Sequence, residues 1–157
     1  MRILVVSDSH GRTLEIEKAI EAQPTAKNIF FLGDCVNDIE DLEFLYPDRT
    51  FHKVCGNCDF SSVLPSAKET VLNSVTIFFT HGHPYSVKSG LGRLRYEAKL
   101  RGAKLVLYGH THISKIDYEE GIYFVNPGSL SNGREGGTSY AVIDIEPNGI
   151  MPIIVKT

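Results

Sequence analysis

Apolar runs alternate with polar clusters along the first two thirds of the chain, and this pattern predicts strands that alternate with helices. The apolar, β-branched run at 2–6 stops at a polar loop, after which apolar residues recur at roughly helical spacing between Leu14 and Ile20. The run at 28–32 ends in the same way, and a short helix after it is expected to end before Pro47, which cannot continue a helix. This repetition indicates an α/β fold.

The remaining apolar runs extend the same pattern. Further strands are expected at 50–54, 75–80 and 104–108, and the composition of 91–100 predicts a helix that ends at Gly102. From Ile113 onward the pattern contains only strands and turns, so antiparallel strands are expected to finish the sheet. No element is predicted in the irregular stretch around Pro65. Because no linker or repeat divides the chain, we predict a single domain over 1–157.

Composition narrows the classes of protein. A chain of 157 residues with 42% hydrophobic content can bury a core of its own, and a net charge of −3 with mixed signs gives no basic stripe for a nucleic-acid polymer. No apolar run approaches the ~20 residues that span a bilayer, and the start has no basic leader region, so no membrane role is expected. Three cysteines, an odd number, fit a reducing compartment, and we predict a cytoplasmic location.

Polar side chains follow five of the predicted strands at their carboxyl ends, where open α/β sheets place their ligands. Imidazole and carboxylate are common ligands of Zn, Mn, Fe and Ni. Since alternate residues of an extended segment face the same way, Asp8 with His10, and His110 with His112, can each converge. The candidate site residues are Asp8, His10, Asp34, Asn57, Asp59, His81, His83, His110 and His112.

Each cluster alone also has an ordinary explanation. A single Asp-x-His or Gly-Asp is common in solvated loops, and one histidine of Gly-His-x-His could simply bond a neighbouring carbonyl. The ordered series, with every member directly after an apolar strand, is what favours a metal site.

The segment from Cys55 to Cys58 allows two chemistries. Its C-x-x-C spacing is that of a redox pair or of half a zinc site, whereas Gly-Asn-x-Asp from the same stretch offers an amide and a carboxylate. A redox role favours a thiol at a helix start, and no helical pattern follows Cys58. We therefore interpret Cys55 as part of a buried strand, with Asn57 rather than a thiol facing the metal.

The motifs SDSHG, LGD, CGNCD, THGH and YGHTH, with VNPGS at 125–129, resemble those of the calcineurin-like metallophosphoesterases. The chain is most similar to their small single-domain bacterial and archaeal phosphodiesterases, whose third motif also carries Cys. The resemblance implies a four-layer α/β/β/α sandwich with a dinuclear metal site at the carboxyl ends of the strands. By the same resemblance, the first metal would be held by Asp8, His10, Asp34 and His112, and the second by Asp34, Asn57, His81 and His110.

The implied chemistry is hydrolysis of a P–O bond by a hydroxide that bridges two divalent ions. Mn²⁺ is the expected metal, with Ni²⁺, Fe²⁺ and Zn²⁺ left open. We expect Asp34 to bridge with its two anionic oxygens, and Asn57 to supply a neutral oxygen that repels phosphate less. By analogy, Asp59 would orient the group at position 58 or a nearby water.

One position departs from the family pattern. Cys58 stands where the broad superfamily has the histidine that stabilises the transition state or protonates the leaving group, and a thiol with a pKa of about 8.5 is a poorer proton donor. Our hypothesis is that His83 or a metal-bound water takes over; alternatively His83, before Pro84, is a turn residue bonded to backbone. Ser129, Asn132 and Arg134 are candidates for substrate contact or for a structural turn.

We predict a metal-dependent phosphodiesterase that acts on a small phosphate ester, with homo-oligomer formation left open. The diester preference comes from the resemblance alone. The alternative is a metal-binding interaction module without turnover, since a related eukaryotic trafficking subunit has the same fold and an altered metal site. Loss of ligands would indicate that alternative, and no ligand of the pattern is missing here.

Overall fold

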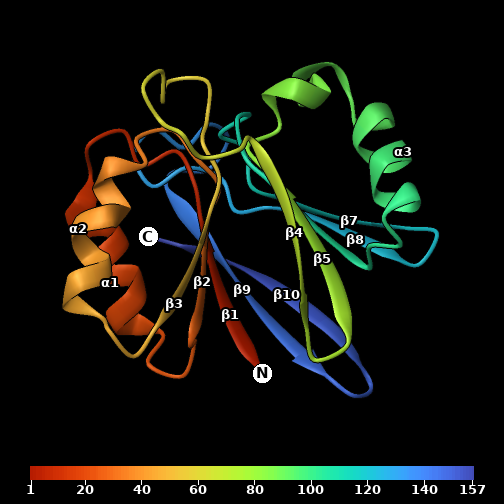
Figure 1. Ribbon diagram of the computed structural model, residues 1–157, viewed down its shortest axis with the longest axis horizontal. Coiled ribbons are helices and arrows are strands. Elements are labelled where there is room, and N and C mark those ends of the chain that lie inside the picture. Colours follow the sequence, from red (N-terminus) through yellow and green to blue (C-terminus); the bar gives the residue numbers. More distant parts are fainter.

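The computed structural model describes residues 1–157 and contains ten strands in two sheets of five (Figure 1). The first sheet contains β1 (Arg2–Val6), β2 (Asn28–Phe31), β3 (Thr50–Lys53), β9 (Ser139–Glu146) and β10 (Gly149–Lys156), in the order β10-β9-β1-β2-β3. The second contains β4 (Ala67–Leu72), β5 (Val75–Thr80), β6 (Leu105–Tyr108), β7 (Lys115–Glu119) and β8 (Ile122–Asn126), in the order β4-β5-β6-β8-β7. The helices are α1 (Thr13–Ala22), α2 (Asn37–Leu45) and α3 (Gly92–Leu100), with 3₁₀ turns η1 (His83–Tyr85) and η2 (Val87–Ser89).

The two sheets and the helices form the four layers that were expected. In β1, Ile3 and Val5 belong to the apolar cluster between the sheets, whereas Leu4 and Val6 pack with residues of α1 and α2. In β5, Phe79 faces the same inner cluster, and its neighbour Phe78 packs with residues of α3. Alternate residues of a strand point to opposite faces, so each central strand is covered on both sides. Figure 1 shows α1 and α2 on one side of the sandwich and α3 on the other.

Parallel pairing brings the polar strand ends to one end of the molecule. β1, β2 and β3 are parallel, as are β5, β6 and β8. Strands β4, β7, β9 and β10 pair antiparallel with their neighbours, but β8 does not fit the expectation that only antiparallel strands finish the fold. The chain leaves β6 for the edge strand β7 and reverses at Glu120–Gly121, so β8 enters between them in the direction of β6.

The pattern gave no sign of β4. It is an edge strand with the sequence AKETVL, it pairs only with β5, and no residue in it is fully buried. An edge strand that faces solvent needs no apolar run, which explains why hydrophobic periodicity failed there. The longest helix, α1, has ten residues, and no helix combines the length and apolar character that crossing a membrane requires.

Candidate metal centre

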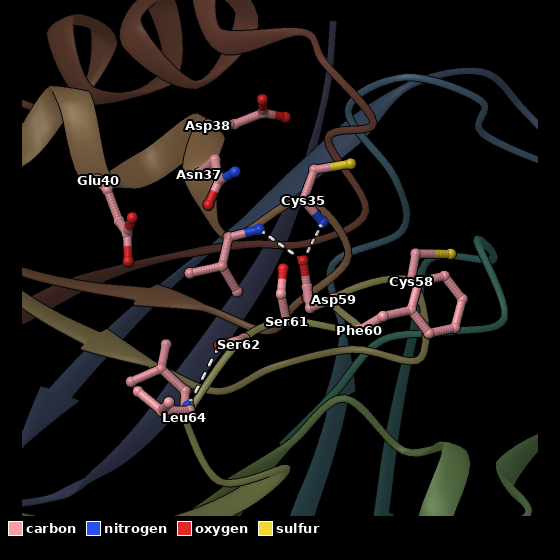
Figure 2. A pocket seen from close by; sticks show the side chains of 12 residues that line it. Cys35, Asn37, Asp38, Glu40, Cys58, Asp59, Phe60, Ser61, Ser62 and Leu64 are labelled. Atoms are coloured by element: carbon pink, nitrogen blue, oxygen red, sulfur yellow. Dashed lines mark hydrogen bonds between the residues drawn. The ribbon is translucent and has the colours of Figure 1, made fainter.

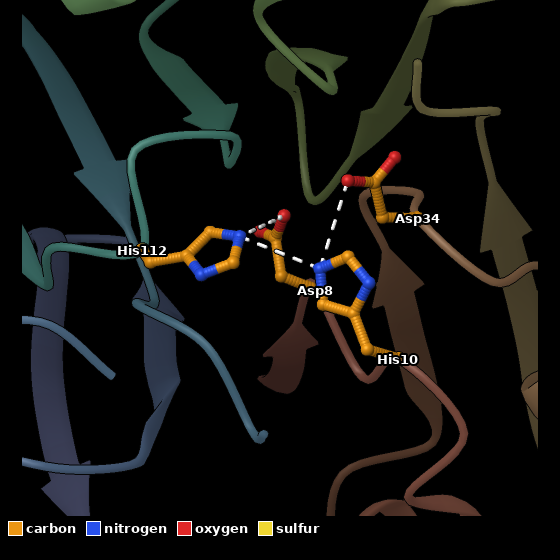
Figure 3. Close-up of side chains that lie close together, drawn as sticks. All are labelled: Asp8, His10, Asp34 and His112. Atoms are coloured by element: carbon orange, nitrogen blue, oxygen red, sulfur yellow. Dashed lines mark hydrogen bonds and ion pairs between the residues drawn. The ribbon is translucent and has the colours of Figure 1, made fainter. Parts of the chain in front are cut away.

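Four polar side chains from separate loops converge beyond the carboxyl ends of the strands. One candidate ligand atom from each of Asp8, His10, Asp34 and His112 lies within 4.8 Å of every other (Figure 3). Asp8 and His10 follow β1, Asp34 follows β2, and His112 follows β6. This is the group that the resemblance implied for the first metal.

The candidate ligand atoms of this first group lie close to one another. His112 Nε2 lies 3.1 Å from Asp8 Oδ1 and 3.4 Å from His10 Nε2. His112 Nδ1 donates to the carbonyl of Asn132 at 3.0 Å, so Nε2 of the neutral ring carries no proton. Asp8 Oδ1 is buried without a hydrogen-bond partner. A buried carboxylate oxygen without a hydrogen-bond partner, with imidazole nitrogens close by, fits a bound cation.

A second group surrounds His81. Its Nε2 lies 3.0 Å from Asn57 Oδ1, 3.1 Å from His110 Nδ1 and 3.6 Å from Asp34 Oδ2. Its Nδ1 donates to the carbonyl of Leu32 at 2.8 Å, which again leaves the inward nitrogen free to act as a ligand. These are the four residues that the resemblance implied for the second metal.

Asp34 faces both groups through one oxygen. Its Oδ2 lies 3.7 Å from His10 Nε2 and 3.6 Å from His81 Nε2, whereas Oδ1 accepts a hydrogen bond from the backbone of Cys58 at 2.9 Å. We expected Asp34 to bridge with its two anionic oxygens. The structure instead places a single oxygen between the groups, because the other is used to hold the loop after β3.

The backbone at these residues differs from the extended chain that we expected. Positive φ angles of 54°, 44°, 62°, 69° and 60° occur at Asp8, His10, Asp34, His110 and His112. The strands end before these residues, so left-handed turns rather than strand alternation aim the side chains, and His110 and His112 enter different groups. Such conformations cost about 1–3 kcal/mol each in non-glycine residues and cluster at functional sites.

Two glycines are required by close approach. A Cβ on Gly56 would lie 2.1 Å from Asp34 Oδ1, and one on Gly109 would lie 2.2 Å from Ser7 Oγ and 2.9 Å from Asp8 Oδ2. Neither has a positive φ, so their role is to leave room for the two carboxylates rather than to permit an unusual turn.

Asp59 anchors the loop that carries Asp34. Its carboxylate accepts hydrogen bonds from the backbone amides of Asp34 (2.9 Å), Cys35 (2.8 Å), Val36 (2.8 Å) and Gly56 (2.7 Å). We expected it to orient the group at position 58 or a water. Both of its oxygens are instead bonded to main chain, so in this structure it positions Asp34.

The two thiols of the C-x-x-C stretch occupy different surroundings. Cys55 lies in the loop after β3 and not in a buried strand as expected; it is half-buried, and Cys58 is exposed. Cys35, Cys55 and Cys58 are free thiols. Although the residue is exposed, partial shielding of its thiol from solvent, reinforced by Asp34, raises the pKa of Cys58 to about 11, so the thiolate that redox chemistry needs is scarce near neutral pH. The geometry thus favours the amide and carboxylate interpretation.

His83 begins η1 beside the second group. Its ring centroid lies 5.4 Å from that of His81 and 6.1 Å from that of His110. Nδ1 of His83 is buried and has no hydrogen-bond partner, so this atom does not make the backbone bond of the alternative interpretation. Burial, followed by the proximity of His81, lowers the pKa of His83, and the ring is mostly neutral at pH 7.

Burial and the charges of neighbouring ligands shift the pKa values of the candidate ligands. Burial and His81 lower the pKa of His110 to about 4. The adjacent carboxylate of Asp8 raises the pKa of His112, and although burial alone would raise the pKa of Asp8, His112 and His81 hold it below its ordinary value. Asp8 is therefore ionised and His110 neutral at pH 7, which are the forms that bind a cation.

Residues that the sequence left uncertain support the ligands through hydrogen bonds. Ser129 Oγ donates to the carbonyl of Asp8 at 2.8 Å, and the carbonyl of Asn132 orients His112, so both serve the structural turn. Asp38, which the sequence analysis missed, accepts from Ser9 Oγ and the amide of Gly11, both at 2.7 Å. Asp38 is the second residue of α2, and an acidic residue in the first turn of the predicted helix was the sequence feature that could have identified it. Arg134, the third uncertain residue, is exposed.

A cavity of about 470 Å³ lies beside the loop that carries Asp34 (Figure 2). The acidic side chains of Asp38, Glu40 and Asp59 line it, together with Cys58 and the apolar loop residue Phe60. We refer to it as the acidic cavity. Its negative charge is unfavourable for binding an anionic group.

The chain matches known proteins over most of its length. A family model described as the calcineurin-like phosphoesterase superfamily domain matches residues 1–148. The probable metallophosphoesterase YsnB of Bacillus subtilis (strain 168) is 31% identical over 149 residues, which cover 93% of this chain and 85% of that protein. The phosphodiesterase YfcE of Escherichia coli (strain K12) is 26% identical over 180 aligned positions, which cover 98% of this chain and 91% of that protein.

A solved structure gives the same result for the fold. The crystal structure of a conserved protein from Streptococcus pneumoniae TIGR4, described as a predicted phosphoesterase, matches with a TM-score of 0.84 and 29% identity. The match covers 99% of this chain and 88% of that one. On the strength of the family match and of this shared architecture, the chain belongs to the calcineurin-like phosphoesterase superfamily.

Proposed function

We propose that this protein is a metal-dependent phosphodiesterase with a dinuclear centre, which hydrolyses a P–O bond of a small phosphate ester. The observation that carries the proposal is the convergence of carboxylate and imidazole ligand atoms around the buried, unpartnered Asp8 Oδ1. Relatives named as phosphodiesterase or metallophosphoesterase support phosphoester hydrolysis, and the preference for diesters follows those names.

The two groups of side chains would hold one divalent ion each. Asp8, His10 and His112 face one position, Asn57, His81 and His110 face the other, and Asp34 Oδ2 lies between them. When bound, such ions would lower the pKa of a nucleophilic water and would offset the negative charge of the phosphoryl oxygens. Mn²⁺ is our working metal, and the ligand types admit Ni²⁺, Fe²⁺ and Zn²⁺ as well.

The remaining residues position the ligands and serve the leaving group. Asp59 fixes the loop of Asp34, and the bonds to Leu32 and Asn132 fix the rings of His81 and His112. Asn57 supplies a neutral oxygen, which keeps the site less repulsive to phosphate. We assign to His83 the hydrogen bond to the departing oxygen, because its ring lies beside the second group with Nδ1 unpartnered, and the thiol of Cys58 is a weak hydrogen-bond donor.

The test is hydrolysis of bis-p-nitrophenyl phosphate and of p-nitrophenyl phosphate by protein stripped with EDTA, before and after Mn²⁺ is added. We expect Mn²⁺ to restore activity and the diester to be cleaved faster. The aryl leaving group needs little protonation, so the assay does not depend on His83 or Cys58. Metal binding without turnover under any divalent ion would replace this proposal with an interaction module.

A further inference from the structure

A second cavity, of about 440 Å³, lies on the α3 side of the metal centre and carries the opposite charge to the acidic cavity. Lys88 of η2, Lys115 at the start of β7, and Arg134 before β9 line it, and no carboxylate does. We call it the basic pocket. Its three cations come from three separate segments, so they meet only in the folded chain.

The basic pocket shares the loop after β6 with two of the candidate ligands. Thr111, which lines it, lies between His110 and His112 in the chain. The backbone amide of Arg134 donates to the carbonyl of His112 at 3.0 Å, which ties the loop of Arg134 to the centre. Figure 1 shows η2 and the loop after β6 at the same end of the molecule, away from α2. A group bound in the pocket would therefore be attached close to the reacting phosphorus.

Most of the positive charge in this pocket is available to a ligand. Lys115 Nζ lies 3.0 Å from Asp117 Oδ2, so its charge is partly balanced. Lys88 and Arg134 are exposed, and neither belongs to an ion pair of the structure. The neighbouring lining is apolar, with Leu91 and Tyr108. Lysine and arginine together form a common phosphate site, in which arginine binds two oxygens at once.

We propose that the basic pocket binds a second phosphate group carried by one arm of the ester substrate. This inference rests on the proposed phosphodiesterase function and specifies its substrate class. The acidic cavity disfavours a phosphate on the opposite side of the centre. The two cavities together therefore orient the substrate so that the arm with the second phosphate points toward α3.

The proposal is tested by measuring the hydrolysis of thymidylyl-thymidine, with and without a 5′ phosphate, in the presence of Mn²⁺. We expect the 5′ phosphate to raise kcat/KM about tenfold, which corresponds to ~1.4 kcal/mol. The double variant Lys88→Gln/Arg134→Gln should hydrolyse both substrates with the same kcat/KM. The control Lys104→Gln, which changes an exposed lysine at the opposite end of β6, should keep the tenfold difference. An unchanged ratio in the double variant, or no gain in the wild type, would overturn the proposal.

A binding measurement separates this inference from the proposed function. Inorganic pyrophosphate is titrated by calorimetry into the EDTA-stripped protein, where no metal can bind it. We expect binding by the wild type and Lys104→Gln and at least tenfold weaker binding by the double variant. If bis-p-nitrophenyl phosphate is not hydrolysed, the proposed function fails, yet this titration still tests the pocket. Equal binding by all three proteins, or none by the wild type, would refute the pocket.

Discussion

The two sheets supply different chemistry to the candidate metal centre. All its oxygen donors, Asp8, Asp34 and Asn57, follow strands of the first sheet, and of its four imidazoles only His10 does so. The loops of the second sheet supply His81, His110 and His112.

This division places the negative charge of the centre on one sheet and most of its neutral nitrogen ligands on the other. Neither sheet alone supplies all the residues of either candidate group, so the candidate ligands meet only when the cluster between the sheets is packed. The difference teaches that the candidate ligand set depends on how the two sheets pack together, and it indicates which substitutions should be most severe.

Asp34→Asn should have the largest effect, because this residue faces ligands from both sheets through one oxygen. We expect metal-dependent hydrolysis of bis-p-nitrophenyl phosphate to fall by at least about 100-fold, more than outer residues of metal sites usually cost. Asp48→Asn, an exposed acid paired with Lys27 before β3, is the matched control. If the Asp34 variant kept half of the wild-type kcat/KM, the bridging position would be wrong.

His83→Ala changes a residue beside the ligands of the second sheet, and it should slow the hydrolysis of esters with a poor leaving group selectively. Its ring lies near His81 and His110, and His83 is not one of the candidate ligands. We predict a loss of about 100-fold for thymidylyl-thymidine, whose alkoxide leaves poorly, and less than about threefold for bis-p-nitrophenyl phosphate. Steady-state kinetics on both substrates decides this. An equal loss on the two would mean that His83 only supports the fold, and no loss would remove its role.

Asp59→Ala should destabilise the loops of the first sheet. It leaves four backbone amides without their acceptor, and we expect the free energy of unfolding to fall by roughly 3 kcal/mol. Urea denaturation measures the change. Glu40→Ala, an exposed acid that lines the same cavity, should cost less than about 0.5 kcal/mol. Similar stabilities for the two variants would contradict the anchoring role.

His52 tests whether a histidine outside the centre behaves differently. It stacks on Phe30 with ring centroids 4.4 Å apart, and burial, followed by the charge of Lys68, lowers its pKa. A folded pKa below the unfolded one makes the unfolded state bind more protons, so stability falls as pH falls below about 6.5. Thermal unfolding of metal-free protein between pH 7.5 and 5 should show a small decrease that His52→Gln reduces. An identical pH dependence in the variant would exclude this contribution.

Much of the architecture follows from the spacing of apolar residues. The strands that were expected at 2–6, 28–32, 75–80 and 104–108 are present, because each is buried on both faces and reads as a continuous apolar run. The edge strand β4 and the parallel direction of β8 could not be foreseen, since both depend on which strands pair across the fold.

The identity of the clustered residues could also be predicted, but not how they are held. Residue types after each strand place Asp8 and His112 at one end of the sheets, and the structure brings them together. The left-handed turns that aim them, and the amides that take up both oxygens of Asp59, are set by contacts between distant loops. Sequence spacing carries no information about such contacts.

The most direct test of a centre shared by two sheets is the number of Mn²⁺ ions bound per chain. Equilibrium dialysis of EDTA-stripped protein against Mn²⁺, followed by elemental analysis, gives this number for the wild type and for Asp34→Asn. The account predicts two ions per wild-type chain and at most one in the variant. One ion or none in the wild type, or two in both proteins, would contradict it.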